Sequence, residues 1–164
     1  MIKMIKLIRN VLLTGLIVFL VSSCDLTKKY EEEEAGKIDK YLNEHPDLDF
    51  TLKQSGLYYL DITVGTGEQP VAGDSAFVYY TGYFLDGIEF DGNTDDDEPY
   101  GFPVGVGYVI PGFDEGIMLM HEGGTAKLLV PSYLGYGNSG YYMPSYTPLL
   151  FDVELDSIVF GSGR

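Results

Sequence analysis

The sequence has few of the side chains on which most enzyme chemistry depends. It contains one cysteine, two histidines and no tryptophan. A single cysteine can form neither an internal disulfide nor a cysteine metal cluster. The two histidines are His45 and His121, and the chain has no G-x-S-x-G or H-E-x-x-H stretch, so serine-hydrolase and zinc-protease motifs are missing. The glycines of "GVGYVIPG" are wrongly spaced for a dinucleotide loop. The sequence therefore predicts neither a cofactor nor a metal.

Basic residues are also scarce. Ten Lys and Arg stand against 25 Asp and Glu, which gives a formal net charge of -15. Three of the cations, Lys3, Lys6 and Arg9, belong to the first ten residues, so the remainder of the chain is more acidic still. Because nucleic-acid binding depends on neutralising phosphates with cations, we predict no nucleic-acid partner.

The N-terminus has the pattern of an export signal. The basic start is followed by an apolar run over residues 11–21, which is too short to span the roughly 30 Å of a bilayer. The next residues, "VSSC", resemble the lipobox of bacterial lipoproteins, in which the cysteine becomes the lipidated first residue of the mature chain. We expect residues 1–23 to be a lipoprotein signal peptide, and Cys24 to carry palmitate and anchor the protein to a membrane of the cell envelope. The alternative is an ordinary secretory signal followed by an incidental cysteine.

Residues 24–55 are rich in charge and are interpreted as an acidic helical spacer. Apolar side chains at Tyr30, Ile38 and Tyr41 have loosely helical spacing, and the helix should end before Pro46. The four glutamates at residues 31–34 favour a solvated helix face over an address signal for surface display.

From Gly56 to Phe160 the sequence consists of short apolar runs separated by turns. The stretches "GLYYLDITVGTG", "GDSAFVYYTGYFLDG", "TAKLLVP" and "LLFDVELDSIVF" are typical of strands, and Asp86-Gly87 predicts a hairpin turn. The stretch "PGFDEGIMLM" instead has helical spacing after an initial Pro-Gly and predicts one short helix. We therefore expect an α+β fold.

The order of motifs in residues 56–160 resembles the FKBP-type peptidyl-prolyl cis-trans isomerases. The matching pieces are "GTGEQPVAGD", "VYYTGYFLDGIEFD", "VIPGFDEGIMLMHEGGTAKLLVP", "LGYG" and "LLFDVELDSI". The resemblance implies an antiparallel half-barrel sheet wrapped around one short helix. It also implies an enzyme that rotates X-Pro peptide bonds in proline-containing polypeptides, here assisting the folding of exported or envelope proteins.

The resemblance also implies the site. By motif position, the catalytic bowl would contain Tyr80, Phe90, Asp91, Ile110, Phe113, Tyr136 and Phe151, and further substrate contacts would come from Tyr100, Val109, Tyr141 and Met143. In the family, the residues matching Tyr136 and Ile110 donate a hydroxyl and a backbone N–H to ligand carbonyls. The acid matching Asp91 forms a hydrogen bond at the edge of the pocket.

Isomerisation requires no nucleophile. The two isomers of an X-Pro bond differ by only about 0.5–1 kcal/mol, and a barrier of about 18–20 kcal/mol separates them. A dry aromatic pocket disfavours the polar, planar amide relative to the twisted one, so tighter binding of the twisted form lowers the barrier. A site of rings with one acid is consistent with this reaction.

The chain departs from the family pattern at three places. Phe113 stands where a tryptophan is common, which predicts reduced activity and weak macrolide binding. Asp95, Asp96 and Asp97 stand where many members have a basic residue, so Asp91 lacks its usual partner. The segment after Tyr136 is about two residues shorter than usual.

Two other functions are consistent with these departures. One is an FKBP-fold binding or chaperone lipoprotein without efficient isomerisation. The other is a surface lipoprotein that binds a cation or carbohydrate through "DGNTDDDE" and the tyrosine-rich "GYYMPSY". An EF-hand loop is excluded in the first stretch, because its sixth and twelfth positions are Asp96 and Phe102 instead of Gly and Glu.

Overall fold

The structure is a computed structural model that describes residues 26–96, 98–139 and 143–163. The chain divides into two compact units, residues 1–36 and residues 37–164. A helix over residues 26–44 crosses this boundary, and it ends before Pro46 as the sequence predicts. None of the helices in the described ranges is both long enough and apolar enough to cross a membrane. The predicted signal peptide and Cys24 lie outside the described residues.

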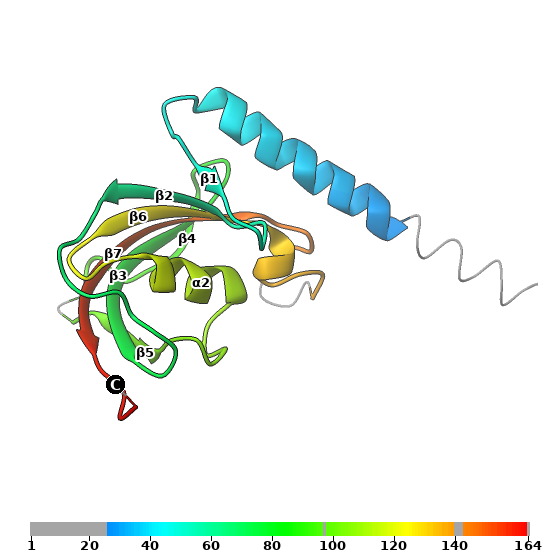
Figure 1. The fold of residues 1–164 in the computed structure, drawn as a ribbon. Helices are drawn as coiled ribbons and strands as arrows, with labels where there is room; N and C mark the ends of the chain where they lie inside the picture. The colour runs from blue at the N-terminus through cyan, green and yellow to red at the C-terminus, as the bar shows by residue number, and fades with distance from the viewer. Residues whose placement is uncertain (1–25, 97, 140–142, 164) are drawn as a thin grey trace, which may run out of the picture. The chain divides into compact units, whose positions relative to one another are not determined.

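The second unit is built on an antiparallel sheet. Its strands are β1 (Thr51–Leu52), β2 (Tyr58–Thr63), β3 (Ser75–Phe84), β4 (Glu89–Gly92), β5 (Tyr100–Pro103), β6 (Thr125–Val130) and β7 (Leu149–Val159). They are ordered β1-β2-β6-β7-β3-β4, and β5 pairs with β3 beside β4. The helix α2 (Pro111–Leu119) lies against the concave face of the curved sheet (Figure 1). The predicted α+β architecture, an antiparallel sheet with one short helix against its concave face, is confirmed.

Alternation along the strands separates the two faces of the sheet. On β7, Phe151, Val153 and Leu155 are buried in the core under α2, whereas Asp152 and Glu154 point to the outer face. Helix α2 approaches β6 closely through two glycines. A Cβ at Gly112 would lie 2.5 Å from Val130 Cγ1, and one at Gly116 would lie 2.5 Å from Leu128 Cδ1. The helix therefore fits tightly inside the sheet.

The hairpin between β3 and β4 turns at Asp86-Gly87, as predicted. Gly87 has a φ of 85°, a left-handed conformation that glycine adopts without a Cβ penalty. The Asp86 carboxylate accepts a hydrogen bond from the backbone N–H of Ile88 at 3.1 Å. This hairpin places the end of β4, and with it Asp91, beside Tyr80 of β3.

A second apolar cluster covers part of the outer face. Ile38 and Tyr41, from the last turns of the helix over residues 26–44, pack against Leu129 and Leu150 of the sheet. Residues within the predicted spacer thus contribute to the second unit, and β1 within the same range pairs with β2. The division of the chain at residues 23 and 55 stays a prediction.

Candidate functional site

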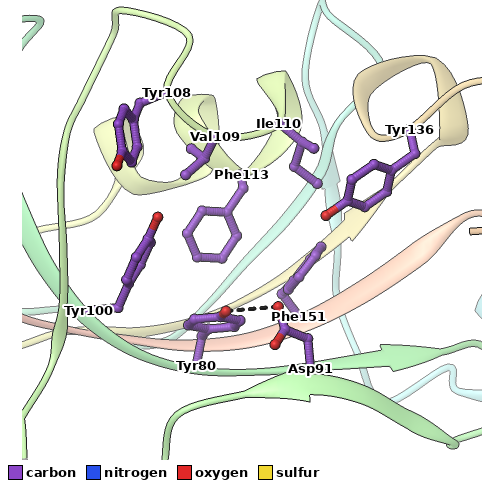
Figure 2. Close-up of a pocket in the computed structure, with 9 residues that line it drawn as sticks. All are labelled: Tyr80, Asp91, Tyr100, Tyr108, Val109, Ile110, Phe113, Tyr136 and Phe151. Atoms are coloured by element: carbon purple, nitrogen blue, oxygen red, sulfur yellow. Dashed lines mark hydrogen bonds between the residues drawn. The ribbon is translucent and has the colours of Figure 1, made fainter. Parts of the chain in front are cut away.

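A cleft of about 400 Å³ lies between α2 and the concave face of the sheet (Figure 2). The residues that line it come from six segments of the chain and are Tyr80, Asp91, Tyr100, Tyr108, Val109, Ile110, Phe113, Tyr136 and Phe151. Their side chains comprise one carboxylate, four phenols and apolar groups. Among the described lining residues there is no thiol, amine or imidazole, so the cleft offers binding surface without a strong nucleophile.

The floor of the cleft is a cluster of packed rings. Phe113, from the first turn of α2, lies 5.1 Å from the ring of Phe151 and 5.5 Å from the ring of Tyr80, both edge-on. The ring of Phe102 lies 6.0 Å from Phe113 on the core side. Edge-on rings at these distances are favourable aromatic contacts. The floor is therefore apolar and is held from several sides.

The one carboxylate of the cleft is held by two donors. The Tyr80 hydroxyl donates to Asp91 Oδ2 at 2.9 Å, and the backbone N–H of Gly92 donates to Asp91 Oδ1 at 3.0 Å. Many members of the family that the sequence resembles have a basic residue in the loop after this acid, whereas this chain has three aspartates there, at residues 95–97. Tyr80 and the backbone of β4 take the place of that basic residue in orienting the acid.

The phenols of Tyr80, Tyr100 and Tyr136 remain protonated at neutral pH, because the pKa of each is raised. Burial, the hydrogen bond to Asp91 and the charge of Asp91 all raise the pKa of Tyr80 well above its usual value. Burial, followed by the charge of Asp91, also raises the pKa of Tyr136. The pKa of Tyr100 is raised mainly by burial, and then by electrostatic interaction with Tyr108 and Asp91. A protonated Tyr136 is available as a hydrogen-bond donor, and its hydroxyl points into the cleft (Figure 2).

Tyr136 is presented by a short turn after the 3₁₀ helix η1 (Ser132–Leu134). The backbone N–H groups of Gly135 and Gly137 both donate to the carbonyl of Ser132, at 2.9 and 2.8 Å. Gly137 has a φ of 63°, which favours glycine at this position. The glycines predicted to flank Tyr136 thus form the turn that leaves its ring 37% exposed.

Ile110 offers a backbone donor to the cleft. It caps the N-terminus of α2, and its carbonyl accepts from the N–H groups of Phe113 and Asp114. Within the described part of the chain, its own N–H donates to no acceptor. Tyr136 and Ile110 both line the cleft, so a phenol hydroxyl and a backbone N–H are its candidate donors.

The structure places eight of the sequence-predicted site residues in the cleft, which are Tyr80, Asp91, Tyr100, Val109, Ile110, Phe113, Tyr136 and Phe151. Phe90 is not among the residues that line the cleft. Its ring packs beside the lining residue Phe151, at 5.8 Å, and lies 5.2 Å from the ring of Phe84. Met143 packs against the core cluster and is not among the lining residues. Tyr141 and Cys24 lie outside the described residues.

Sequence reasoning missed Tyr108, which lines the cleft opposite Tyr100. The segment that carries it is fixed by Asp114, whose carboxylate accepts from the N–H groups of Gly105 and Gly107 at 2.8 and 3.4 Å. Both glycines have positive φ values, 72° and 73°. The only signal in the sequence was that Tyr108 directly precedes Val109 and Ile110, which were both predicted to belong to the site.

Asn93 belongs to "DGNTDDDE", the stretch that the alternative cation-binding function would use, and the structure gives it another role. Its side chain is buried and binds the backbone of β3. Asn93 Oδ1 accepts from the N–H of Tyr80 at 2.8 Å, and Asn93 Nδ2 donates to the carbonyl of Val78 at 3.0 Å. Across the described ranges, no group of three or more His, Cys, Asp and Glu side chains could hold a metal ion.

Comparisons with known proteins agree with this geometry. The sequence model of the family described as FKBP-type peptidyl-prolyl cis-trans isomerase matches residues 66–156. An FK506-binding protein of Neisseria meningitidis serogroup B is 42% identical over 102 residues, which cover 61% of this chain and 94% of that protein. The FKBP-type peptidyl-prolyl cis-trans isomerase FkpA of Aeromonas hydrophila is 44% identical over 106 residues, which cover 64% of this chain and 39% of that protein.

Solved structures show the same likeness. The crystal structure of FkpA from Escherichia coli superposes with a TM-score of 0.67 at 33% sequence identity, covering 80% of this chain and 63% of that one. A peptidyl-prolyl cis-trans isomerase from Pseudomonas syringae superposes with a TM-score of 0.69 at 27% identity, covering 82% of this chain and 96% of that one.

Proposed function

The chain belongs to the FKBP-type peptidyl-prolyl cis-trans isomerases, and from that premise we propose that the aromatic cleft between α2 and the sheet is where it rotates X-Pro bonds. The enzyme acts on proline-containing polypeptides. The observation that carries the assignment to the cleft is its composition, a floor of rings with two hydrogen-bond donors and one oriented acid. No other reactive group is needed, because the reaction makes and breaks no covalent bond.

In the proposed mechanism, the proline ring lies on Phe113 and Phe151, which exclude water from the amide. The planar amide loses stabilisation on leaving water because its resonance form is polar, whereas the twisted transition state is less polar and loses less. The cleft thereby binds the twisted form more tightly than either planar isomer. Each 1.4 kcal/mol of this difference accelerates rotation about tenfold.

The donors position the polypeptide. We assign the Tyr136 hydroxyl and the Ile110 N–H to two carbonyl oxygens of the substrate, and Asp91, oriented by Tyr80, to the edge of the cleft. Each neutral hydrogen bond is expected to contribute about 0.5–1.5 kcal/mol. These contacts hold the X-Pro bond over the rings while it rotates.

The role of the Ile110 N–H can be tested by replacing Ile110 with proline. Ile110 has a φ of -59°, which a proline ring adopts without change, so the variant removes the N–H and keeps the φ of residue 110. We expect kcat/KM on X-Pro peptides to fall about three- to tenfold. Ile110→Val keeps the N–H and a branched apolar side chain, and should stay within about twofold of the wild type. Equal activity of the two variants would show that this N–H does not bind substrate.

We further propose that the enzyme is lipid-anchored through Cys24 in the cell envelope and assists the folding of exported or envelope proteins there. The support is the basic start, the apolar run of residues 11–21 and "VSSC". The acidic segment of residues 26–36 would then act as a helical spacer next to the membrane.

Replacing Cys24 with serine tests the anchor, because serine cannot carry the thioether-linked lipid. The variant is expected to leave the membrane fraction, and mass spectrometry of the wild-type protein should show a lipidated N-terminal Cys24. A wild-type chain that retains Met1 or has an unmodified Cys24 would contradict the anchor without affecting the isomerase assignment.

A further inference from the structure

One end of the cleft is formed by two exposed tyrosines. Tyr100 begins β5 and Tyr108 lies in the segment before α2, and their hydroxyls point toward each other (Figure 2). The side chains are 39% and 64% exposed. The ring of Tyr100 is fixed, because it stacks on Phe102 at 5.6 Å and contacts Tyr80 edge-on at 6.2 Å. We call this pair the tyrosine mouth.

Acidic side chains lie in the cleft and on the loop that leads to the tyrosine mouth. Asp91 lines the same cleft, and none of its described lining residues is a Lys, Arg or His. The loop that joins β4 to β5 covers residues 93–99, ends directly before Tyr100 and carries Asp95, Asp96 and Glu98 with exposed side chains. A peptide residue that enters at this end therefore meets aromatic faces and phenol oxygens, and no cationic side chain among the described lining residues.

These features favour a cationic side chain. An ammonium or guanidinium group is attracted to the face of an aromatic ring, and long Lys and Arg stems also cover apolar surface. The chain itself shows this contact elsewhere, since Lys53 Nζ lies 4.8 Å from the centroid of the Tyr59 ring. The carboxylates of the cleft and of the loop between β4 and β5 add a longer-range attraction that salt weakens.

We propose that the tyrosine mouth is a specificity subsite that selects substrates with a lysine or arginine next to the proline. The inference rests on the proposed function of the cleft and names a substrate class for it. Tyr108 contributes the open face of the mouth, Tyr100 the fixed face, and the loop between β4 and β5 the negative field. An acidic residue at the same substrate position is disfavoured.

The test compares Lys-Pro peptides with peptides that have norleucine in place of lysine, because norleucine keeps the length of the stem and removes the charge. One peptide series places the residue before the proline and a second places it after. With the full chain at low salt, kcat/KM for lysine is expected to exceed that for norleucine about fivefold in at least one series. Raising the salt should reduce the ratio.

Variants separate the rings from the charges. Tyr108→Leu is expected to lower the lysine-to-norleucine ratio about threefold, and Asp95→Asn with Asp96→Asn should lower both the ratio and its salt dependence. A matched control is Glu154→Gln with Asp156→Asn, which removes two charges from the outer face of β7. This control should leave the ratio within about twofold of the wild type.

The possible results separate a failure of the subsite from a failure of the proposed isomerase function. A ratio near one in both series, with peptides still isomerised, would overturn the subsite and leave the isomerase cleft intact. An unchanged ratio in Tyr108→Leu would also overturn the subsite. A folded chain that accelerates no peptide would overturn the proposed function of the cleft and this inference with it.

Discussion

Replacing Phe151 with alanine is expected to lower the free energy of unfolding by about 3–5 kcal/mol and to remove most of the isomerase activity. The ring is 4% exposed and contacts Phe113, Tyr80 and Phe90 with centroid distances of 5.1, 6.4 and 5.8 Å. Its removal leaves a cavity under the cleft that the neighbouring rings can fill only in part. The substitution therefore removes core packing and, at the same time, part of the surface on which the proline ring is proposed to lie.

A matched control separates these two losses. Leu155 is on the same strand and the same face, is fully buried and does not line the cleft. Leu155→Ala should cost about 2–5 kcal/mol of stability and keep kcat/KM per folded molecule. Phe151→Leu should preserve more of the fold than Phe151→Ala and still reduce activity. Denaturant unfolding and peptide assays below the unfolding transition measure both quantities, and full activity of Phe151→Leu would contradict the role of this ring.

Replacing Asn93 with alanine should have the second large effect, although its side chain contacts no substrate. The substitution leaves the N–H of Tyr80 and the carbonyl of Val78 without their partner. Unsatisfied buried polar groups cost about 1–3 kcal/mol each, so for the two groups we expect a loss of about 2–6 kcal/mol in the free energy of unfolding. Because Asn93 binds the backbone of Tyr80, which in turn orients Asp91, activity should fall as well.

The neighbouring threonine provides the control for Asn93. Thr94 is exposed, and its hydroxyl lies 3.5 Å from that of Thr81. Thr94→Ala should change the free energy of unfolding by no more than about 0.5 kcal/mol. If Asn93→Ala and Thr94→Ala were equally stable in denaturant unfolding, the hydrogen bonds of Asn93 would have no part in holding β4 against β3.

The sequence was sufficient to predict the parts of the fold where hydrophobic period and turn chemistry agree. Strand β7 alternates between buried and more exposed residues, β3 is rich in aromatic residues, and α2 begins with Pro-Gly and continues with helical spacing, so each appeared at its predicted place. Strand β5 was harder to predict, because "YGFP" contains a glycine and a proline, both of which are unfavourable in strands. Only its pairing with β3 identifies it as a strand.

Some residues of the site could likewise be predicted from the sequence and others could not. Tyr80, Phe113 and Tyr136 were predicted because they belong to motifs whose order resembles a family. Tyr108 was not predicted, since its place in the cleft depends on Asp114 holding two distant backbone N–H groups. Nothing in the sequence indicated the role of Asn93, because its neighbours are acidic and only the fold shows its amide bound to β3. The roles of such residues depend on contacts between segments that are separate in the sequence.

The departures from the family pattern also have a structural explanation. The position that is often tryptophan is filled by Phe113, whose ring is supported by Tyr80, Phe102 and Phe151. The acid expected to lack a partner is instead held by the Tyr80 hydroxyl and the Gly92 N–H. The cleft thus retains a complete floor and an oriented carboxylate without the tryptophan or the basic residue.

The most direct test of the cleft as the site of isomerisation is an exchange NMR measurement on one X-Pro peptide with the full chain. The uncatalysed exchange takes tens to hundreds of seconds. The account predicts fast exchange with the wild type and a loss of about tenfold or more in the folded double variant Tyr136→Phe with Asp91→Ala. Equal exchange rates for the wild type and the folded double variant would contradict it.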